Sequence, residues 1–264
     1  RQPRRNMLYY KRNTTLYEER GLFMRKKNFR LAALVLLAVW VLAACGKTES
    51  GAPAAKAIKR PAVASAELQF TAPAAGATIA VFDTTAGEIR AVLYPDKAPQ
   101  ACANFTGLAQ QGFYNGLSFT RVVSGFCAEA GLTAEGASST IWSGSGFAPE
   151  TSDSLHHYSG ALCAAVNESG QCTSVFYFMQ TLPEAPSDDV LAQMTSAGYR
   201  QEVIDAYKAA GGAPYLDYTD TVFGQVYSGM DIVDTIAQAA ADENGKPAAD
   251  ILINSITIST YSGS

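Results

Sequence analysis

Cysteine and histidine are the residue types whose spacing in this chain can be tested first for chemistry. Four cysteines follow residue 100, namely Cys102, Cys127, Cys163 and Cys172. They show no CxxC spacing, so neither a redox pair nor a zinc site is predicted. The four cysteines could form disulfides, with three possible connectivities, or stay as buried free thiols, and the sequence leaves both alternatives open. The two histidines, His156 and His157, are adjacent and would point to opposite faces of a strand, which favours a structural role over shared metal ligation. Because Gly-rich phosphate loops and GxSxG and HExxH motifs are also missing from the sequence, we expect no metal and no cofactor.

The formal net charge of −4 conceals two parts of opposite sign. Residues 1–44 hold ten Lys and Arg against two Asp and Glu, a net of +8, and the remaining residues hold ten against 22, a net of −12. Nucleic-acid-binding proteins carry basic surfaces, so the acidic main part argues against a nucleic-acid partner. It also argues against a domain that lies flat on anionic lipid.

Residues 24–44 have the organisation of an export signal. Met24 opens a basic stretch, and residues 31–44 are fourteen consecutive apolar residues. A membrane-spanning helix needs about 20 such residues, whereas a signal-peptide core needs roughly 7–15. The stretch ends in Leu-Ala-Ala-Cys-Gly at 42–46, which resembles the lipobox of bacterial lipoprotein precursors.

The lipobox resemblance implies cleavage before Cys45 and a lipid on its sulfur, which would hold the protein on the outer face of a bacterial cell membrane. The alternative is an ordinary signal peptide that happens to precede a cysteine. Residues 1–23 lie upstream of Met24, and we interpret them as upstream sequence or a mis-called leader. Residues 45–75 are rich in Ala, Pro, Lys and Ser, a composition typical of a flexible tether.

Residues 76–264 have the pattern of a single β-rich domain. Eight strand-like runs occur, at 77–82, 87–94, 118–124, 125–130, 161–167, 174–180, 221–226 and 251–260. Helices are predicted at 98–111 and 230–241, the first with Pro99 in its opening turn. Many short strands and two helices predict a closed antiparallel barrel with helices at its ends.

One segment interrupts this β-rich pattern. Residues 182–213 have helical periodicity, with Val203, Ile204 and Tyr207 on one face. The glycines at 211–212 are suited to end the helix. Because the segment lies between two strand-like runs, we interpret it as a helical insertion in a loop.

Several short motifs follow one another along the same domain. They are TTAGEI at 84–89, GFYNGLSFTRVVSGF at 112–126, SVFYF at 174–178, YLD at 215–217, TVFGQV at 221–226 and MDIVD at 230–234. Together they resemble the cyclophilin-type peptidyl-prolyl cis-trans isomerases over about residues 78–260. The resemblance implies a mainly β fold, a closed eight-stranded antiparallel barrel capped by two helices.

The resemblance places the family's catalytic arginine at Arg121. The implied reaction is rotation about X–Pro bonds, whose resonance barrier of ~18–20 kcal/mol makes uncatalysed exchange slow. A guanidinium is always charged and carries several donors, so it can hydrogen-bond the prolyl nitrogen when the twisted amide regains its lone pair. The alternative is a strand arginine in a surface ion pair.

The resemblance also implies a substrate-binding set. Its members are Phe126, Cys127, Glu129, Ala165, Val166, Val175, Tyr177, Tyr215, Leu216 and Asp220. Phe126, Ala165 and Leu216 match the family, while Cys127, Tyr177 and Tyr215 replace Met, Phe and Trp. The added hydroxyl of Tyr177 needs a partner if it is buried. For each apolar member the alternative is a purely structural role in the barrel core.

The polar rim departs further from the family. Glu129 and Val175 each replace Gln, Val166 replaces Asn, and Asp220 replaces His. A carboxylate beside Arg121 would form a charge-assisted pair that either holds the guanidinium rigid or competes with the substrate for it. We therefore hypothesise that Glu129 lowers turnover by engaging Arg121.

Three functions stay open at this point, because fold alone does not decide function. The first is an active isomerase that assists the folding of exported proteins. The second is a module or scaffold that binds proline-containing segments and turns them over poorly. The third makes residues 182–213 a partner-docking or cleft-shaping element. We expect the isomerase, acting as a monomer on proline-containing polypeptides.

Overall fold

The computed structural model describes residues 56–183 and 186–263. The predicted lipidation site Cys45, the signal peptide and residues 1–23 lie outside the described residues. Within the part that the structure describes, every helix is too short or too polar to cross a membrane.

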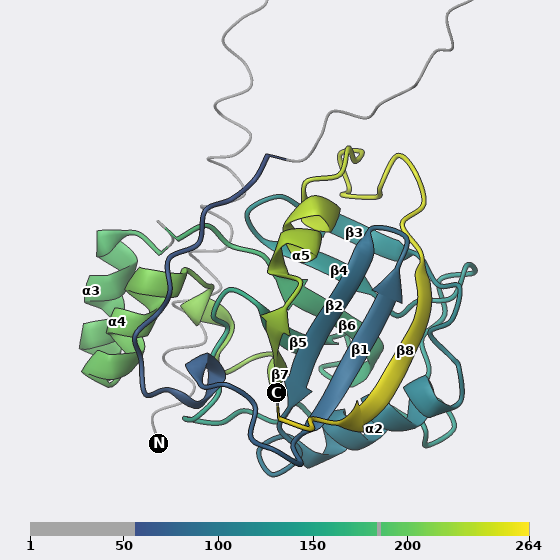
Figure 1. Ribbon diagram of the computed structural model, residues 1–264, viewed down its shortest axis with the longest axis horizontal. Helices are drawn as coiled ribbons and strands as arrows, with labels where there is room; N and C mark the ends of the chain where they lie inside the picture. Colours follow the sequence, from purple (N-terminus) through teal and green to yellow (C-terminus); the bar gives the residue numbers. More distant parts are fainter. Residues whose placement is uncertain (1–55, 184–185, 264) are drawn as a thin grey trace, which may run out of the picture. The chain divides into compact units, whose positions relative to one another are not determined.

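Eight antiparallel strands form one curled sheet (Figure 1), which confirms the predicted mainly β fold. They are β1 (Thr78–Thr84), β2 (Gly87–Leu93), β3 (Phe119–Val123), β4 (Cys127–Ala130), β5 (Ala161–Val166), β6 (Cys172–Met179), β7 (Thr221–Ser228) and β8 (Ile253–Thr260). Their order across the sheet is β3-β4-β6-β5-β7-β2-β1-β8. The chain therefore crosses over several times, and residues far apart in sequence become neighbours.

The two edge strands, β3 and β8, meet at one end only. An isolated bridge joins Ser118 to Leu252, and the amide of Phe119 donates to the carbonyl of Ile251 at 2.9 Å. Further along β3, the amide of Val122 donates instead to the carbonyl of Gly245 at 2.7 Å. A loop thus covers part of the β3 edge, and the eight-stranded sheet curls into a half-barrel whose edge strands are joined at one end.

Two helices lie at opposite ends of the curled sheet, α2 (Pro99–Gln110) and α5 (Met230–Ala237) (Figure 1). Pro99 occupies the first turn of α2, where its missing N–H costs nothing. The Glu150 carboxylate accepts hydrogen bonds from the next two amides of that turn at 3.1 and 2.9 Å. The α5 helix ends at Ala237, four residues before the predicted end at Ala241.

Two apolar layers lie on the two faces of the sheet. Along β6, Phe176 and Phe178 belong to the interior cluster under α2, whereas Tyr177 belongs to a second cluster. This alternation follows from the period of two in a strand. The second cluster also contains Cys127 and Cys163 from the neighbouring strands β4 and β5. It forms the surface on which the candidate site lies.

The four cysteines after residue 100 are buried free thiols. Of the two states that the sequence left open, the structure contains the thiols. Cys127 lies on β4, Cys163 on β5 and Cys172 on β6, all within the sheet, while Cys102 lies on α2. Burial raises the pKa of the Cys102 thiol to about 12, so it stays neutral at physiological pH.

The predicted insertion is helical and forms a hairpin of two helices, α3 (Asp188–Ala197) and α4 (Gln201–Ala210). Val203, Ile204 and Tyr207 share the buried face of α4, as the periodicity predicted. Gly211 ends α4 with a φ of 79°, at a place where a side chain would collide with the carbonyl of Leu182.

Residues 56–75, which we call the docked segment, pack against the domain and are not a free tether. In Figure 1 this segment runs between the α3–α4 hairpin and the sheet. Gln69 is 5% exposed, and its side chain bonds the backbone N–H and carbonyl of His156 at 2.7 and 2.9 Å. The composition misled the prediction because a few separate side chains hold the segment, including polar ones and Phe70, whose ring centre lies 4.8 Å from that of Tyr158.

Arg60 is the main anchor of the docked segment. Its guanidinium pairs with the buried Asp234 carboxylate on α5 at 2.5 Å. It also donates to the Ser159 hydroxyl at 2.7 Å and to the Thr181 carbonyl at 2.8 Å. Asp234 is 4% exposed, so loss of Arg60 leaves a buried carboxylate with one fewer partner.

We expect Arg60→Ala to destabilise the protein by about 1–3 kcal/mol, the range for removing the partner of a charged hydrogen-bonding group. The measurement is denaturant unfolding combined with limited proteolysis of residues 56–75, which should become faster in the variant. Lys59→Ala is the matched control, because Lys59 is exposed. Equal stability and equal cleavage in the two variants would contradict the anchoring role.

Candidate active site

The strand register places the predicted catalytic arginine in a row with two other site residues. Arg121 on β3 lies opposite Glu129 on β4, and Glu129 lies opposite Tyr177 on β6. Directly opposed residues in an antiparallel sheet point to the same face. The row therefore presents a guanidinium, a carboxylate and a phenol side by side.

Arg121 is held by contacts with an aromatic ring and a sulfur atom. Its guanidinium carbon lies 5.7 Å from the centre of the Phe126 ring, and one guanidinium nitrogen lies 3.5 Å from the Cys127 sulfur. The first contact has the geometry of a cation–π interaction. The loop at Gly245 lies close to the Arg121 stem, where an added Cβ would approach to 3.1 Å.

Among the described residues, Arg121 takes part in none of the ion pairs. The charge-assisted pair that we expected between Glu129 and Arg121 is therefore not formed. Although the two residues face each other across the ladder, the guanidinium turns toward Phe126 and Cys127. This leaves its donors available to a substrate.

Glu129 still acts on Arg121 through its charge. Burial raises the pKa of the Glu129 carboxyl, the positive charge of Arg121 opposes that rise, and the negative charge of Asp220 adds to it. Two carboxylates therefore interact across the site, and ionising both is unfavourable. Whenever Glu129 is ionised, its negative charge reduces the positive potential of the guanidinium.

We expect Glu129→Gln to increase kcat/KM for a proline peptide by about two- to fivefold at neutral pH, because the full field of Arg121 then acts on the substrate. The pKa of the wild-type carboxyl lies above its ordinary value, so the carboxyl becomes protonated at a higher pH than an exposed glutamate would. As the pH falls, the kcat/KM of the variant divided by that of the wild type should therefore approach one. The measurement is the isomerisation rate from pH 5 to 8. Glu135→Gln, at an exposed position, is the control. If Glu129→Gln brings no gain at any pH, Glu129 does not restrain turnover.

Tyr177 and Asp220 form a hydrogen-bonded pair at the edge of the site. The buried hydroxyl of Tyr177 donates to the Asp220 carboxylate at 2.7 Å. Burial raises the pKa of Asp220, and the bond from Tyr177 and a backbone bond from Val166 oppose that rise. Tyr177 and Asp220, which both depart from the family pattern, thus form a hydrogen bond with each other. This bond gives the buried phenol the partner that it requires.

An apolar surface lies beside Arg121 and is formed by residues of the second apolar cluster. Cys127 and Tyr177 are buried members, and the half-buried members from the predicted substrate-binding set are Phe126, Ala165, Tyr215 and Leu216. Burial raises the pKa of the Cys127 thiol to about 12 despite the opposing effect of Arg121, so the sulfur stays neutral. It can line a pocket but is poorly suited to act as a nucleophile.

Val166 and Val175 are not part of this surface. Val166 packs against the interior cluster on the other face of the sheet, and its backbone rather than its side chain faces Asp220. Val175 is half-buried and belongs to neither cluster, but it lies two residues before Tyr177 on β6 and therefore on the same face of the sheet. The structure thus places nine of the ten predicted substrate-binding residues on this side of the sheet and directs only the side chain of Val166 to the other face.

Sequence reasoning missed a buried polar network centred on Asp217. One carboxylate oxygen accepts a hydrogen bond from the ring of His156 at 3.0 Å. The other oxygen accepts three hydrogen bonds, from the ring of His157 at 3.0 Å, from the backbone N–H of His157 at 2.8 Å and from the Tyr207 hydroxyl at 2.6 Å. The histidines precede β5 in an irregular segment, so both rings can turn to one carboxylate. The position of Asp217 directly after Tyr215 and Leu216 was the available signal.

These observations define a class of site. A guanidinium that forms no ion pair with the other described residues lies beside an apolar surface, and the neighbouring thiol is neutral. Such a site can grip an apolar ring and hydrogen-bond a twisted amide, a task that requires no covalent step. This is the chemistry of peptidyl-prolyl cis-trans isomerisation on a curled β-sheet.

The comparisons with known proteins agree with this class. Residues 79–258 match the family described as cyclophilin type peptidyl-prolyl cis-trans isomerase. A protein of Staphylococcus aureus (strain COL), assigned as a peptidyl-prolyl cis-trans isomerase, is 34% identical over 179 residues, which cover 67% of this chain and 90% of the relative. A Staphylococcus epidermidis protein with the same assignment is 33% identical over the same share of each chain. The chain belongs to the cyclophilin-type peptidyl-prolyl cis-trans isomerase family.

Solved structures show the same fold. A crystal structure of a cyclophilin type peptidyl-prolyl cis-trans isomerase from Cryptosporidium parvum superposes with a TM-score of 0.54 and 19% identity, covering 70% of this chain and 99% of that one. A second crystal structure of that protein, determined in the presence of the dipeptide Ala-Pro, has the same TM-score and 20% identity. The likeness confirms the predicted cyclophilin fold.

Proposed function

We propose that this chain isomerises X–Pro bonds of exported proteins, with Arg121 as its catalytic residue. The observation that carries the proposal is the state of Arg121, which is held by Phe126 and Cys127 and forms no ion pair within the described residues. In the twisted amide the prolyl nitrogen becomes an acceptor, and the guanidinium can donate to it. The apolar surface of Phe126 and Leu216 suits the proline ring.

We infer that the domain works on the outer face of a bacterial cell membrane, held by a lipid on Cys45. The support is the sequence of residues 24–45, a basic start, a short apolar core and a small-small-Cys ending. Because residues 56–75 dock on the domain, only residues 46–55 are left to join it to Cys45. Ten residues span at most about 35 Å, so the site would stay close to the membrane.

A protease-independent assay tests the activity. Line-shape or exchange measurements on a proline-containing peptide should show an exchange rate that rises in proportion to enzyme concentration, above an uncatalysed exchange that takes tens of seconds or more. A peptide that binds without faster exchange would contradict catalysis and support a binding module instead.

Fractionation of a bacterial host tests the location. The chain from Met24 should be recovered with the membrane and incorporate labelled fatty acid, and Cys45→Ser should abolish both results. Membrane recovery that survives Cys45→Ser without fatty-acid labelling would contradict the lipid anchor. The isomerase assay on residues 56–264 is independent of this outcome.

A further inference from the structure

Two residues of the proposed substrate surface lie on an element with little internal support. Tyr215 and Leu216 belong to the 3₁₀ turn η2 (Pro214–Leu216) in the connection between α4 and β7. The turn's own backbone bonds are Leu216 N–H to the Ala213 carbonyl at 3.0 Å and Asp217 N–H to the Pro214 carbonyl at 3.2 Å. Short 3₁₀ segments have poor hydrogen-bond geometry, so the placement of this wall depends on outside contacts.

The α3–α4 hairpin supplies such contacts at both ends of η2. The Tyr199 hydroxyl, between the two helices, donates to the Pro214 carbonyl at 3.2 Å. The Tyr207 hydroxyl, on α4, donates to the carboxylate of Asp217 at 2.6 Å. One phenol thus holds the residue that begins η2, and the other holds the residue that follows it.

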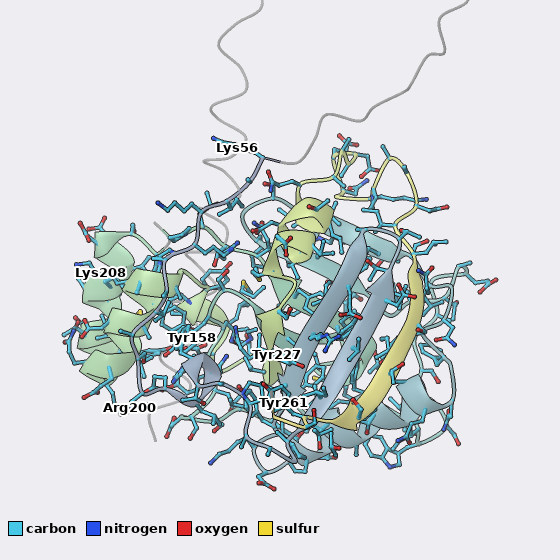
Figure 2. The ribbon with its side chains drawn as sticks, viewed as in Figure 1. Lys56, Tyr158, Arg200, Lys208, Tyr227 and Tyr261 are labelled. Carbon is cyan, nitrogen blue, oxygen red and sulfur yellow. The ribbon has the colours of Figure 1, made fainter. Side chains whose placement is uncertain are left out.

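The hairpin is itself firmly attached, so it can act as a support. Tyr158 packs on Tyr207 with ring centres 4.5 Å apart, and Figure 2 shows Tyr158 between the hairpin and the sheet. Arg200, labelled at the hairpin in Figure 2, pairs through two nitrogens with Glu67 of the docked segment at 2.8 and 3.0 Å. Met194 from α3 completes this buried cluster.

The acceptor of the Tyr207 bond is equally well fixed. Asp217 is 2% exposed and is held by His156 and His157 from the segment before β5. His156 is in turn bonded at both its backbone N–H and carbonyl by Gln69. Because the Asp217 carboxylate is fixed in this way, its bond with the Tyr207 hydroxyl fixes the position of η2 relative to the hairpin.

We propose that Tyr199 and Tyr207 are positioning residues that hold the Tyr215–Leu216 wall in its substrate-binding place. The inference rests on the proposed function, and it assigns the inserted hairpin a role in substrate affinity. Tyr207 is buried in the cluster of the hairpin and Tyr199 packs against it, whereas Tyr215 and Leu216 pack in the cluster beside Arg121. The hydrogen bonds to Pro214 and Asp217 connect the hairpin to η2.

Three Tyr→Phe variants test the proposal. Tyr207→Phe and Tyr199→Phe each remove one hydroxyl that bonds η2 or its neighbour. Tyr158→Phe is the matched control, because its buried hydroxyl has no hydrogen-bond partner among the described residues, although its ring lies in the same cluster. The readouts are the Kd of a proline peptide by titration and the separate kcat and KM of isomerisation, well below the melting temperature.

We expect Kd and KM to rise about three- to tenfold in Tyr207→Phe and less in Tyr199→Phe, with kcat near the wild-type value. Tyr158→Phe should leave all three unchanged. A merely structural role would lower the melting temperature and leave Kd and KM as they are, and that result would overturn the proposal. If Tyr207→Phe does not fold, Tyr199→Phe, which removes a bond to an uncharged carbonyl, decides by the same criteria.

Amide hydrogen exchange separates this proposal from the proposed function. The amides of Leu216 and Asp217 should exchange faster in Tyr207→Phe than in wild type. In Tyr158→Phe their exchange rates should equal those of wild type. If the wild type neither binds nor isomerises proline peptides, the proposed function fails, while faster exchange at these amides still supports positioning. Unchanged exchange in the folded tyrosine variants would overturn positioning whatever the activity.

Discussion

Arg121→Ala should lose about 10²- to 10³-fold in kcat/KM for a proline peptide, the cost of removing one well-placed donor from a transition-state site. The loss should fall on kcat, because the apolar members Phe126 and Leu216 that grip the substrate remain in place. Peptide affinity should therefore change little. The measurement is protease-independent exchange alongside a binding titration.

Arg121→Lys refines the same prediction. Lysine keeps the positive charge but lacks the planar fork of donors, so its rate should lie between those of wild type and Arg121→Ala. Arg90→Ala is the control, because Arg90 on β2 is exposed and its ion pair is with the exposed Glu88. If Arg121→Ala retains the wild-type rate, the guanidinium is not the catalytic group.

Asp217→Ala should destabilise the fold by about 3–5 kcal/mol, the cost of breaking a buried, hydrogen-bonded charge network. The substitution leaves the ring nitrogens of His156 and His157 and the Tyr207 hydroxyl without their acceptor. For a domain of this size the melting temperature should fall by about 10 °C. Asp231→Ala, at an exposed position on α5, should stay close to wild type.

The pH dependence of that network has a defined sign. Burial alone would raise the pKa of Asp217, but the hydrogen bonds from the two histidines hold it at about 2. The unfolded carboxyl has a pKa of about 3.9, so the stabilisation is complete above that pH and disappears as the pH falls through the folded value. The stability gap between wild type and Asp217→Asn should therefore narrow from about pH 4 toward pH 2. A gap independent of pH over this range would show that the charge of Asp217 does not contribute.

Local patterns in the sequence were sufficient for most of the secondary structure. Strand alternation and helical periodicity predicted the strands, the two end helices and the buried face of α4 at Val203, Ile204 and Tyr207. The collinear motifs resembled the family to which the chain belongs, and they placed the candidate arginine at Arg121. These features depend on residues that are close in sequence, so a single sequence contains them.

Contacts between distant residues could not be read in the same way. The prediction that residues 45–75 form a flexible tether was wrong over 56–75, because Arg60 finds Asp234 174 positions away. The predicted bond from Glu129 to Arg121 is absent in the described structure, because the guanidinium turns toward Phe126 and Cys127. Side-chain direction at such places is decided by neighbours that only the folded sheet brings together.

The sequence by itself therefore determined the β-rich fold class, the helical insertion and the arginine on which the proposed chemistry depends. Only the tertiary structure decided how that site is supported. It paired Tyr177 with Asp220 across 43 positions and joined Asp217 to His156 and His157 across about 60. It also left Arg121 without an ion pair among the described residues. The physical reason is that short-range periodicity sets which face a residue occupies, whereas strand order and register set which residue lies opposite it.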